Sequence, residues 1–430
     1  MRRLSQNKGY ALAFSLIFLF LIVSFVAAYI LASAHGLSTA NRGADSSRAY
    51  YIADAGITDA FIQLRGYSSP ASSFTVSNAS FDPGSGKMGS YSVTAASNGA
   101  SWPIYTLTSV GTYNGVTKTL VLKAQQTSIS SYAYLSNTEI HPTYGALWWI
   151  TGMTTVGPVR TNGTLNISGS PIFDGTTTQS GSAINYYNGV TSNPNFVNGL
   201  TLSAPTVTFP TTALLNNISS SASSGGLVLT GNSTVVFNAN GTINVTNSAR
   251  GWNNTNMAKP TNGMIYVQNT NSSTTDGNVT VQGTVKGQVT VASANQMYIS
   301  GNLVYNTDPR TNPASTDMLG LVSKNDITVL ANSAPANLEL DAVIVALNGS
   351  FQVDQWWLTG KGNMIQYGSL VNNYCGPTGV FDPSTGNLTG GYNQLQYYDT
   401  RLQTMIPPGF MAAVDSTGRT VYVKLSYREL

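Results

Sequence analysis

The fold is decided near the N-terminus, where residues 10–34 read YALAFSLIFLFLIVSFVAAYILASA. This stretch carries no charged residue, and as an α-helix it would be roughly 37 Å long, enough to cross the apolar core of a bilayer. Arg2, Arg3 and Lys8 precede it, and basic residues at this place hold the N-terminus in the cytoplasm. The sequence therefore predicts a single membrane-spanning helix, with the bulk of the chain exported.

The helical pattern does not end at the membrane. Apolar residues continue at helical spacing through Ala49, Ile52, Ala53, Ile57, Ala60, Phe61 and Leu64. We therefore expect one helix over residues 10–65. A secretory signal peptide cleaved after Ala34 is the competing interpretation, because Ala32-Ser33-Ala34 resembles a cleavage site. The apolar part of such a signal is usually only about 7–15 residues long.

The composition argues against several classes of catalyst. Only 9% of the 430 residues are charged, and the chain has two histidines and one cysteine. These counts exclude a disulfide framework and a Cys/His zinc site, and they leave little imidazole for acid–base catalysis. Asp308, Asp317 and Asp326 are too widely spaced for a calcium loop. We expect no metal and no cofactor.

Residues 66–126 alternate with a period of two, which predicts a small antiparallel sheet. Within it, Asn114-Gly115 separates two alternating runs and is a dipeptide typical of a tight hairpin. The last segment, residues 419–430, reads RTVYVKLSYREL and alternates in the same way. We expect this C-terminal strand to return to the sheet, so that residues 127–418 form an insertion.

The insertion contains short alternating strands separated by Gly and Asn turns, for example at residues 227–230, 279–281 and 289–291. A rhythm of roughly 15–25 residues favours a β-solenoid, in which each strand stacks on the one below it. A β-sandwich is the alternative. The expected fold class is α+β, with a long N-terminal helix, a small antiparallel sheet and a large all-β insertion.

The charge of the insertion bears on its partners. Residues 127–418 contain eight Lys/Arg and twelve Asp/Glu, which gives a net charge of −4. Surfaces that follow the phosphates of nucleic acids are basic. DNA is therefore a disfavoured partner.

Two short motifs resemble those of the type IV pilins. Lys8-Gly9 followed by Tyr10 is similar to a prepilin-peptidase site, which implies a leader peptide over residues 1–9 and cleavage after Gly9. Residues 49–57, AYYIADAGI, resemble a signature of large minor pilins and tip pseudopilins, and its matching positions are Ala53, Asp54, Ala55 and Gly56. The resemblance implies assembly with other pilins through the helix, after residence in the inner (cytoplasmic) membrane.

The chain departs from the pilin pattern at two places. Most pilins have Phe at the first mature position and Glu at the fifth, whereas this chain has Tyr10 and Phe14. In a filament that Glu is understood to meet the N-terminal ammonium of the next, more distal subunit, because an unpaired charge in an apolar helix bundle is costly. Phe14 thus resembles the tip-type members, which lack the acid. An ordinary one-pass anchor with no filament is the alternative.

Three segments of the insertion resemble exported solenoids that follow a pilin-like helix: residues 157–163 (GPVRTNG), 338–342 (LELDA) and 348–351 (NGSF). The resemblance implies a minor pilin or tip pseudopilin that displays a β-solenoid at the cell surface or on a pilus. Adhesion or surface contact is the expected role, and a DNA-capturing competence pilin is the alternative. A β-helical carbohydrate-active enzyme is the least favoured function.

Two groups of residues are candidates for contact or chemistry. Trp148-Trp149 and Trp356-Trp357 are adjacent pairs, and in a strand one member of each pair must face outward, where it would suit a surface glycan or another cell-envelope ligand. A capping loop or a neighbouring pilin that covers them is the structural alternative. Glu339 and Asp341 share a strand face, as paired catalytic carboxylates do, but we interpret them as the solvent face of an alternating strand. We expect no enzymatic activity.

Overall fold

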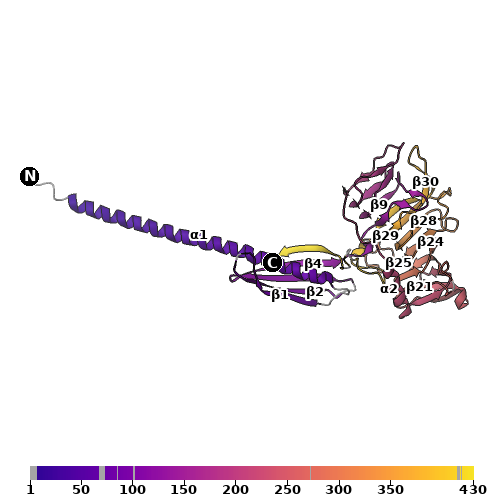
Figure 1. Cartoon of the computed structure of the whole chain (residues 1–430), viewed down its shortest axis with the longest axis horizontal. Coiled ribbons are helices and arrows are strands. Elements are labelled where there is room, and N and C mark those ends of the chain that lie inside the picture. The colour runs from indigo at the N-terminus through magenta and orange to yellow at the C-terminus, as the bar shows by residue number, and fades with distance from the viewer. Residues whose placement is uncertain are drawn as a thin grey trace, which may run out of the picture. The chain divides into compact units, whose positions relative to one another are not determined.

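The computed structural model describes residues 7–66, 73–84, 86–99, 102–271, 273–413, 417 and 419–430, with only the backbone of residues 7–9. It contains one long apolar helix, a small antiparallel sheet and a large sheet-rich region, which confirms the predicted α+β class (Figure 1). Its contacts divide the chain into two compact units, Met1–Gln125 with Tyr422–Leu430, and Gln126–Val421.

The first unit combines the long helix with a five-stranded sheet in the order β1-β2-β3-β4-β33. Its elements are α1 (Asn7–Gly66), β1 (Ser73–Phe81), β2 (Gly89–Ser97), β3 (Ile104–Tyr113), β4 (Val116–Gln126) and β33 (Tyr422–Glu429). Figure 1 shows the sheet against the C-terminal part of α1, while the N-terminal part extends beyond it. The helix begins at residue 7 and ends at residue 66, close to the range expected from its apolar periodicity.

The β3–β4 hairpin has the predicted turn. Asn114 and Gly115 have φ angles of 48° and 78°, both in the left-handed region that a two-residue type I′ turn needs. The strands pair in register from Tyr113 opposite Val116 to Ile104 opposite Gln125. On the other side of β4 lies β33, where the Leu430 N–H donates to the Thr119 carbonyl at 3.0 Å.

The second unit consists mainly of short strands. The strands of its first part are β5 (Tyr134–Thr138), β6 (Ile140–His141), β7 (Gly145–Ala146), β8 (Trp149–Ile150), β9 (Thr154–Val156), β10 (Val159–Thr161), β11 (Asn166–Ser168), β12 (Ile172–Asp174), β13 (Thr177–Gln179), β14 (Asn185–Tyr186), β15 (Asn195–Phe196) and β16 (Leu200–Thr201). Helix α2 (Thr212–Ser223) follows. Three short 3-10 helices also occur, η1 (Ile129–Ser131), η2 (Ser248–Arg250) and η3 (Thr400–Gln403).

The strands after α2 are longer. They are β17 (Leu227–Thr230), β18 (Ser233–Phe237), β19 (Thr242–Asn247), β20 (Trp252–Ala258), β21 (Met264–Gln268), β22 (Val279–Val285), β23 (Gln288–Ser293), β24 (Met297–Tyr305), β25 (Met318–Ser323), β26 (Ile327–Val329), β27 (Leu338–Ala346), β28 (Phe351–Val353), β29 (Asn363–Tyr374), β30 (Gly379–Phe381), β31 (Leu388–Gly391) and β32 (Asn393–Tyr398).

Most of these strands pair in parallel. The longest parallel ladder follows the order β17-β21-β23-β25-β27-β29-β5-β10-β13-β16. A second ladder follows β18-β22-β24-β26-β28, and a third follows β29-β32-β9-β12-β15. Stacked parallel strands need both faces covered, and the buried Val, Ile and Leu residues along them supply that core.

The order along the ladder differs from the order along the chain. The strand β5 lies between β29 and β10, so the first strands of the unit join the last ones in the middle of the ladder. In Figure 1, β9 and β21 lie at opposite ends of this region, with β29 between them. Between β16 and β17 the chain crosses from one end of the ladder to the other, and α2 packs Leu214, Leu215 and Ile218 into a core shared with Met264.

Candidate functional site

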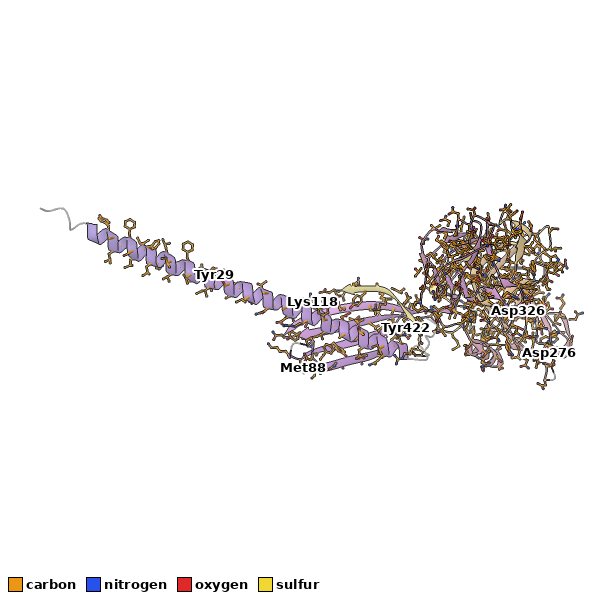
Figure 2. All side chains as sticks on the ribbon, turned by 45° about the horizontal axis from the view of Figure 1, so that its top comes forward. Tyr29, Met88, Lys118, Asp276, Asp326 and Tyr422 are labelled. Carbon is orange, nitrogen blue, oxygen red and sulfur yellow. The ribbon has the colours of Figure 1, made fainter. Side chains whose placement is uncertain are left out.

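The first candidate site is the exposed apolar part of α1. Tyr10 and Phe14 are each 71% exposed, and large apolar side chains remain exposed as far as Leu37. Figure 2 shows Tyr29 on this part of the helix, with no sheet against it. From Tyr10 onward α1 is long and apolar enough to cross a membrane, judged by length and composition. So many exposed apolar side chains are stable only if lipid or other helices cover them.

The processing residues predicted from the sequence are only partly visible. The leader residues 1–6 lie outside the described part of the chain, and of Lys8 and Gly9 only the backbone is described. Tyr10 is described and lies exposed on the helix. Cleavage after Gly9 stays a prediction.

The signature segment of α1 is the place where helix and sheet meet most closely. Ala49, Ala53 and Ala60 are fully buried against the sheet. On the sheet side, a Cβ added to Gly111 of β3 would lie 2.4 Å from both the Ala49 carbonyl oxygen and the Ala53 nitrogen. A Cβ on Gly56 would meet the Ser109 hydroxyl at 2.6 Å. Small residues on both elements therefore set the distance between helix and sheet.

The signature acid has a partner within its own unit. Asp54 accepts a hydrogen bond from the Tyr427 hydroxyl of β33. Burial and this carboxylate raise the pKa of Tyr427, so the phenol stays protonated and remains a donor at neutral pH. One turn further on, Asp59 accepts from the Tyr91 hydroxyl at 2.8 Å. Ala55 lies half-buried between them. The two acids tie α1 to β33 and β2. No sequence signal pointed to Tyr427 and Tyr91 as their partners, or to Gly111 as the residue that faces Ala49 and Ala53.

The four candidate tryptophans differ in exposure. Trp357 is 56% exposed, Trp148 and Trp356 are half-buried, and Trp149 is only 4% exposed. Trp149 lies in β8, but Trp356 and Trp357 lie in a turn, so the strand geometry expected for that pair is wrong. Their relative exposure is set by the turn and by neighbouring rings.

Both tryptophan pairs lie near the segment 375–392. The Trp148 ring contacts Tyr187 with a centroid distance of 4.9 Å, and Tyr187 contacts Phe381 at 5.5 Å. Trp356 contacts Trp357 at 5.3 Å, and its carbonyl lies against Gly391, which in turn packs on Gly379. Residues more than two hundred positions apart thus form one aromatic region. The sequence identified the tryptophans but not Tyr187 or Phe381.

The acid pair of β27 shares one arginine, Arg310, with a third carboxylate. Arg310 donates to Glu339 at 2.7 Å and to Asp308 at 2.7 Å, and lies 3.6 Å from Asp341. Our expectation of a solvent face is wrong for Asp341, which is 1% exposed and accepts from the Tyr305 N–H at 3.0 Å. Burial raises the pKa of Asp341 to about 7. The shared counter-ion and the backbone donor give these carboxylates a structural role.

Two of the other acids also accept hydrogen bonds from backbone N–H groups. Asp317 accepts from the N–H groups of Gly287 at 2.6 Å and Thr307 at 2.7 Å. Asp326 accepts from the Ser350 N–H at 2.8 Å. Within the described ranges, no group of three His, Cys, Asp or Glu side chains has the spacing of a metal site.

Comparison with known proteins adds little about function. A family model described as a domain of unknown function, DUF4900, matches residues 92–182, which run from β2 to just after β13. No curated protein matches the chain. Among solved structures, the competence-associated pilin ComZ from Thermus thermophilus is 12% identical, with 90% of this chain and 98% of that chain covered and a TM-score of 0.34. That TM-score is too low to establish a shared fold.

Proposed function

We propose that the chain is a type IV pilin-like subunit, a non-enzymatic minor pilin or tip pseudopilin. The observation that supports this best is the division of α1 into two parts. Its N-terminal part exposes apolar side chains on all sides, and its C-terminal part buries a seam of small residues on the sheet. A helix of this kind is anchored in the inner membrane first and then packs against other pilin helices. Each Leu, Ile or Phe side chain that is fully removed from water lowers the free energy by about 1.5–3 kcal/mol. Lipid and neighbouring pilin helices both remove these side chains from water, so the same apolar surface can serve in the membrane and in the filament.

The second unit is proposed to be a β-solenoid insertion displayed at the cell surface. Its role is contact with a surface glycan or another cell-envelope ligand through the aromatic region around Trp148 and Trp357. The net charge of −4 over residues 127–418 favours a neutral partner over DNA. A competence pilin that captures DNA remains the second candidate function, and the tests below separate the two.

Processing tests the pilin assignment. Prepilin peptidase should release a mature protein that begins at Tyr10, and Gly9→Val should leave the precursor uncut in the membrane. Gly36→Val is the matched control, because a Cβ at Gly36 meets nothing within 4 Å and the site lies well beyond the cleavage point. N-terminal sequencing of membrane-derived protein measures the start. A mature protein that begins at His35 would contradict the proposal and make the chain a secreted protein.

Binding tests the second unit. Full-length protein in detergent should bind whole cells or glycan surfaces with little dependence on salt, and Trp357→Ala should weaken that binding. DNA capture by phosphate contacts would instead fall by about 10³–10⁵ as salt rises from low to physiological levels. Salt-sensitive DNA binding that is unchanged in Trp357→Ala would favour the competence function.

A further inference from the structure

A pocket lies beneath the aromatic region of the second unit. Its cavity volume is about 80 Å³, and among the described residues no charged side chain lines it. Trp149, Phe351 and Leu370 form a buried apolar floor, while Trp148 and Phe381 lie half-buried at the rim. About 10–15 Å³ of such volume holds one water, so the pocket has room for a group of several heavy atoms but not for a whole sugar chain.

Two side-chain amides line this pocket and keep groups that no described residue engages. Gln394 of β32 is 7% exposed, and its amide has no hydrogen-bond partner among the described residues. Asn372 of β29 is 2% exposed, and its carbonyl oxygen accepts from the Phe351 N–H at 2.9 Å, which leaves its NH₂ group without a partner in the same ranges. These free amide groups are open to the water in the pocket, so they are available to hydrogen-bond a ligand that displaces this water.

Hydrogen bonds to a carboxylate outside the pocket hold the floor in place. The Trp149 indole N–H donates to Glu139 at 3.3 Å, and the Tyr134 hydroxyl donates to the same carboxylate at 3.1 Å. Burial raises the pKa of Glu139. Glu139 is therefore engaged by Trp149 and Tyr134 and does not line the pocket. A ligand in the pocket therefore meets uncharged groups, which are the two amides, aromatic and aliphatic side chains, the Thr378 hydroxyl and the Cys375 thiol.

We propose that this pocket binds the acetamido group of a neutral N-acetylated glycan. The methyl group meets the apolar floor, and the amide of the sugar exchanges hydrogen bonds with Gln394 and Asn372, which supply both acceptors and donors. The sugar ring stays outside and stacks on Trp148 and Phe381 at the rim. The absence of charge in the lining disfavours phosphate and carboxylate ligands. This inference rests on the proposed surface-contact role and specifies its ligand.

Binding is measured with the full-length protein in detergent. Chitotriose, which carries acetamido groups, should bind in isothermal titration calorimetry, and cellotriose, which lacks them, should bind at least about tenfold more weakly, the value of one good hydrogen bond. Gln394→Leu keeps the volume and removes the amide, so it should abolish the preference. Gln352→Leu is the control, because Gln352 lies outside the pocket and contacts Thr328.

Cys375 locates the ligand. It lines the pocket and is the only cysteine of the chain, so one maleimide adduct reports on this place alone. Its thiol reacts slowly because burial raises its pKa. At ten times its Kd, chitotriose should slow the labelling by about tenfold.

Three results would overturn the inference: no heat with chitotriose, equal binding of both sugars, or an unchanged preference in Gln394→Leu. Trp148→Ala provides a second variant that removes the rim and leaves the amides, and it should weaken both sugars. Cleavage at Gly9 is scored separately in the same variants. Normal processing without sugar binding would leave the pilin assignment standing and reject only the pocket.

Discussion

The close approach of α1 to β3 gives the sharpest structural prediction, which concerns Gly111→Ala. The new Cβ would lie 2.4 Å from two backbone atoms of α1 and 2.8 Å from the Ala53 Cα, where ordinary contacts begin near 3.4 Å. Backbone atoms cannot rotate away, so the helix must move outward by about 1 Å, and a gap of this size forfeits a quarter to a half of each dispersion contact. Overpacked cores lose about 1–3 kcal/mol, and we expect the upper end here.

Hydrogen exchange measured by mass spectrometry on the full chain reports the stability of each of the two units separately. A loss of about 3 kcal/mol should speed exchange in the buried part of α1 and in β3 by roughly a hundredfold, while β25 and β27 keep their protection. Gly66→Ala is the matched control, since a Cβ there meets nothing within 4 Å. If Gly111→Ala exchanges no faster than Gly66→Ala, the reasoning about small residues in the seam is refuted.

Two further predictions concern charge. Phe14→Glu should weaken placement at a filament tip, because a carboxylate without a distal ammonium costs a few kcal/mol in an apolar bundle. Immunogold labelling should show fewer labelled tips than the control Phe14→Leu gives, which keeps this position apolar, and more subunits along the shaft would contradict the tip assignment. Burial raises the pKa of Asp341 from its ordinary 3.8 to about 7. The folded state therefore holds a proton that the unfolded state releases, and this residue's contribution to stability falls as pH rises between these values. Asp341→Asn should flatten that slope in the denaturant midpoint of the second unit, while Asp174→Asn, at an exposed acid, should leave it unchanged; an unaltered slope in Asp341→Asn would show that another group controls it.

The sequence predicted those features that depend on neighbouring residues. Apolar periodicity gave α1, and Asn114-Gly115 gave the β3–β4 hairpin, because helical faces and two-residue turns are encoded within a few positions. The alternating rhythm of the second unit predicted abundant short strands for the same reason. These features need no knowledge of distant partners.

The features that were missed depend on contacts between distant residues. The pairing of β5 with β29 brings Leu135 opposite Val371, and no repeat in the sequence specifies that register. Asp341 follows the alternation of an exposed strand face, but Arg310 and Tyr305 cover it from a neighbouring layer. Gln394 has the pattern of an ordinary polar strand residue, and only its position in the pocket shows that its amide can meet a ligand. Parallel stacking makes such contacts long-range, so local patterns carry little information about them.

The pairing of β5 with β29 brings the beginning and the end of the second unit together, which explains how so large a unit can be inserted. A solenoid that stacked in chain order would place its first and last strands at opposite ends of the ten-strand ladder, roughly 40 Å apart. Instead, the Thr127 N–H donates to the Val421 carbonyl at 2.9 Å, and the Ala413 N–H donates to the Thr127 carbonyl at 2.7 Å.

The two ends of the insertion therefore meet, as β4 and β33 do in the small sheet, and the connection needs no long linker. The long connection that this strand order requires runs from β16 to β17 instead. There α2 buries its apolar face and so stabilises the connecting segment.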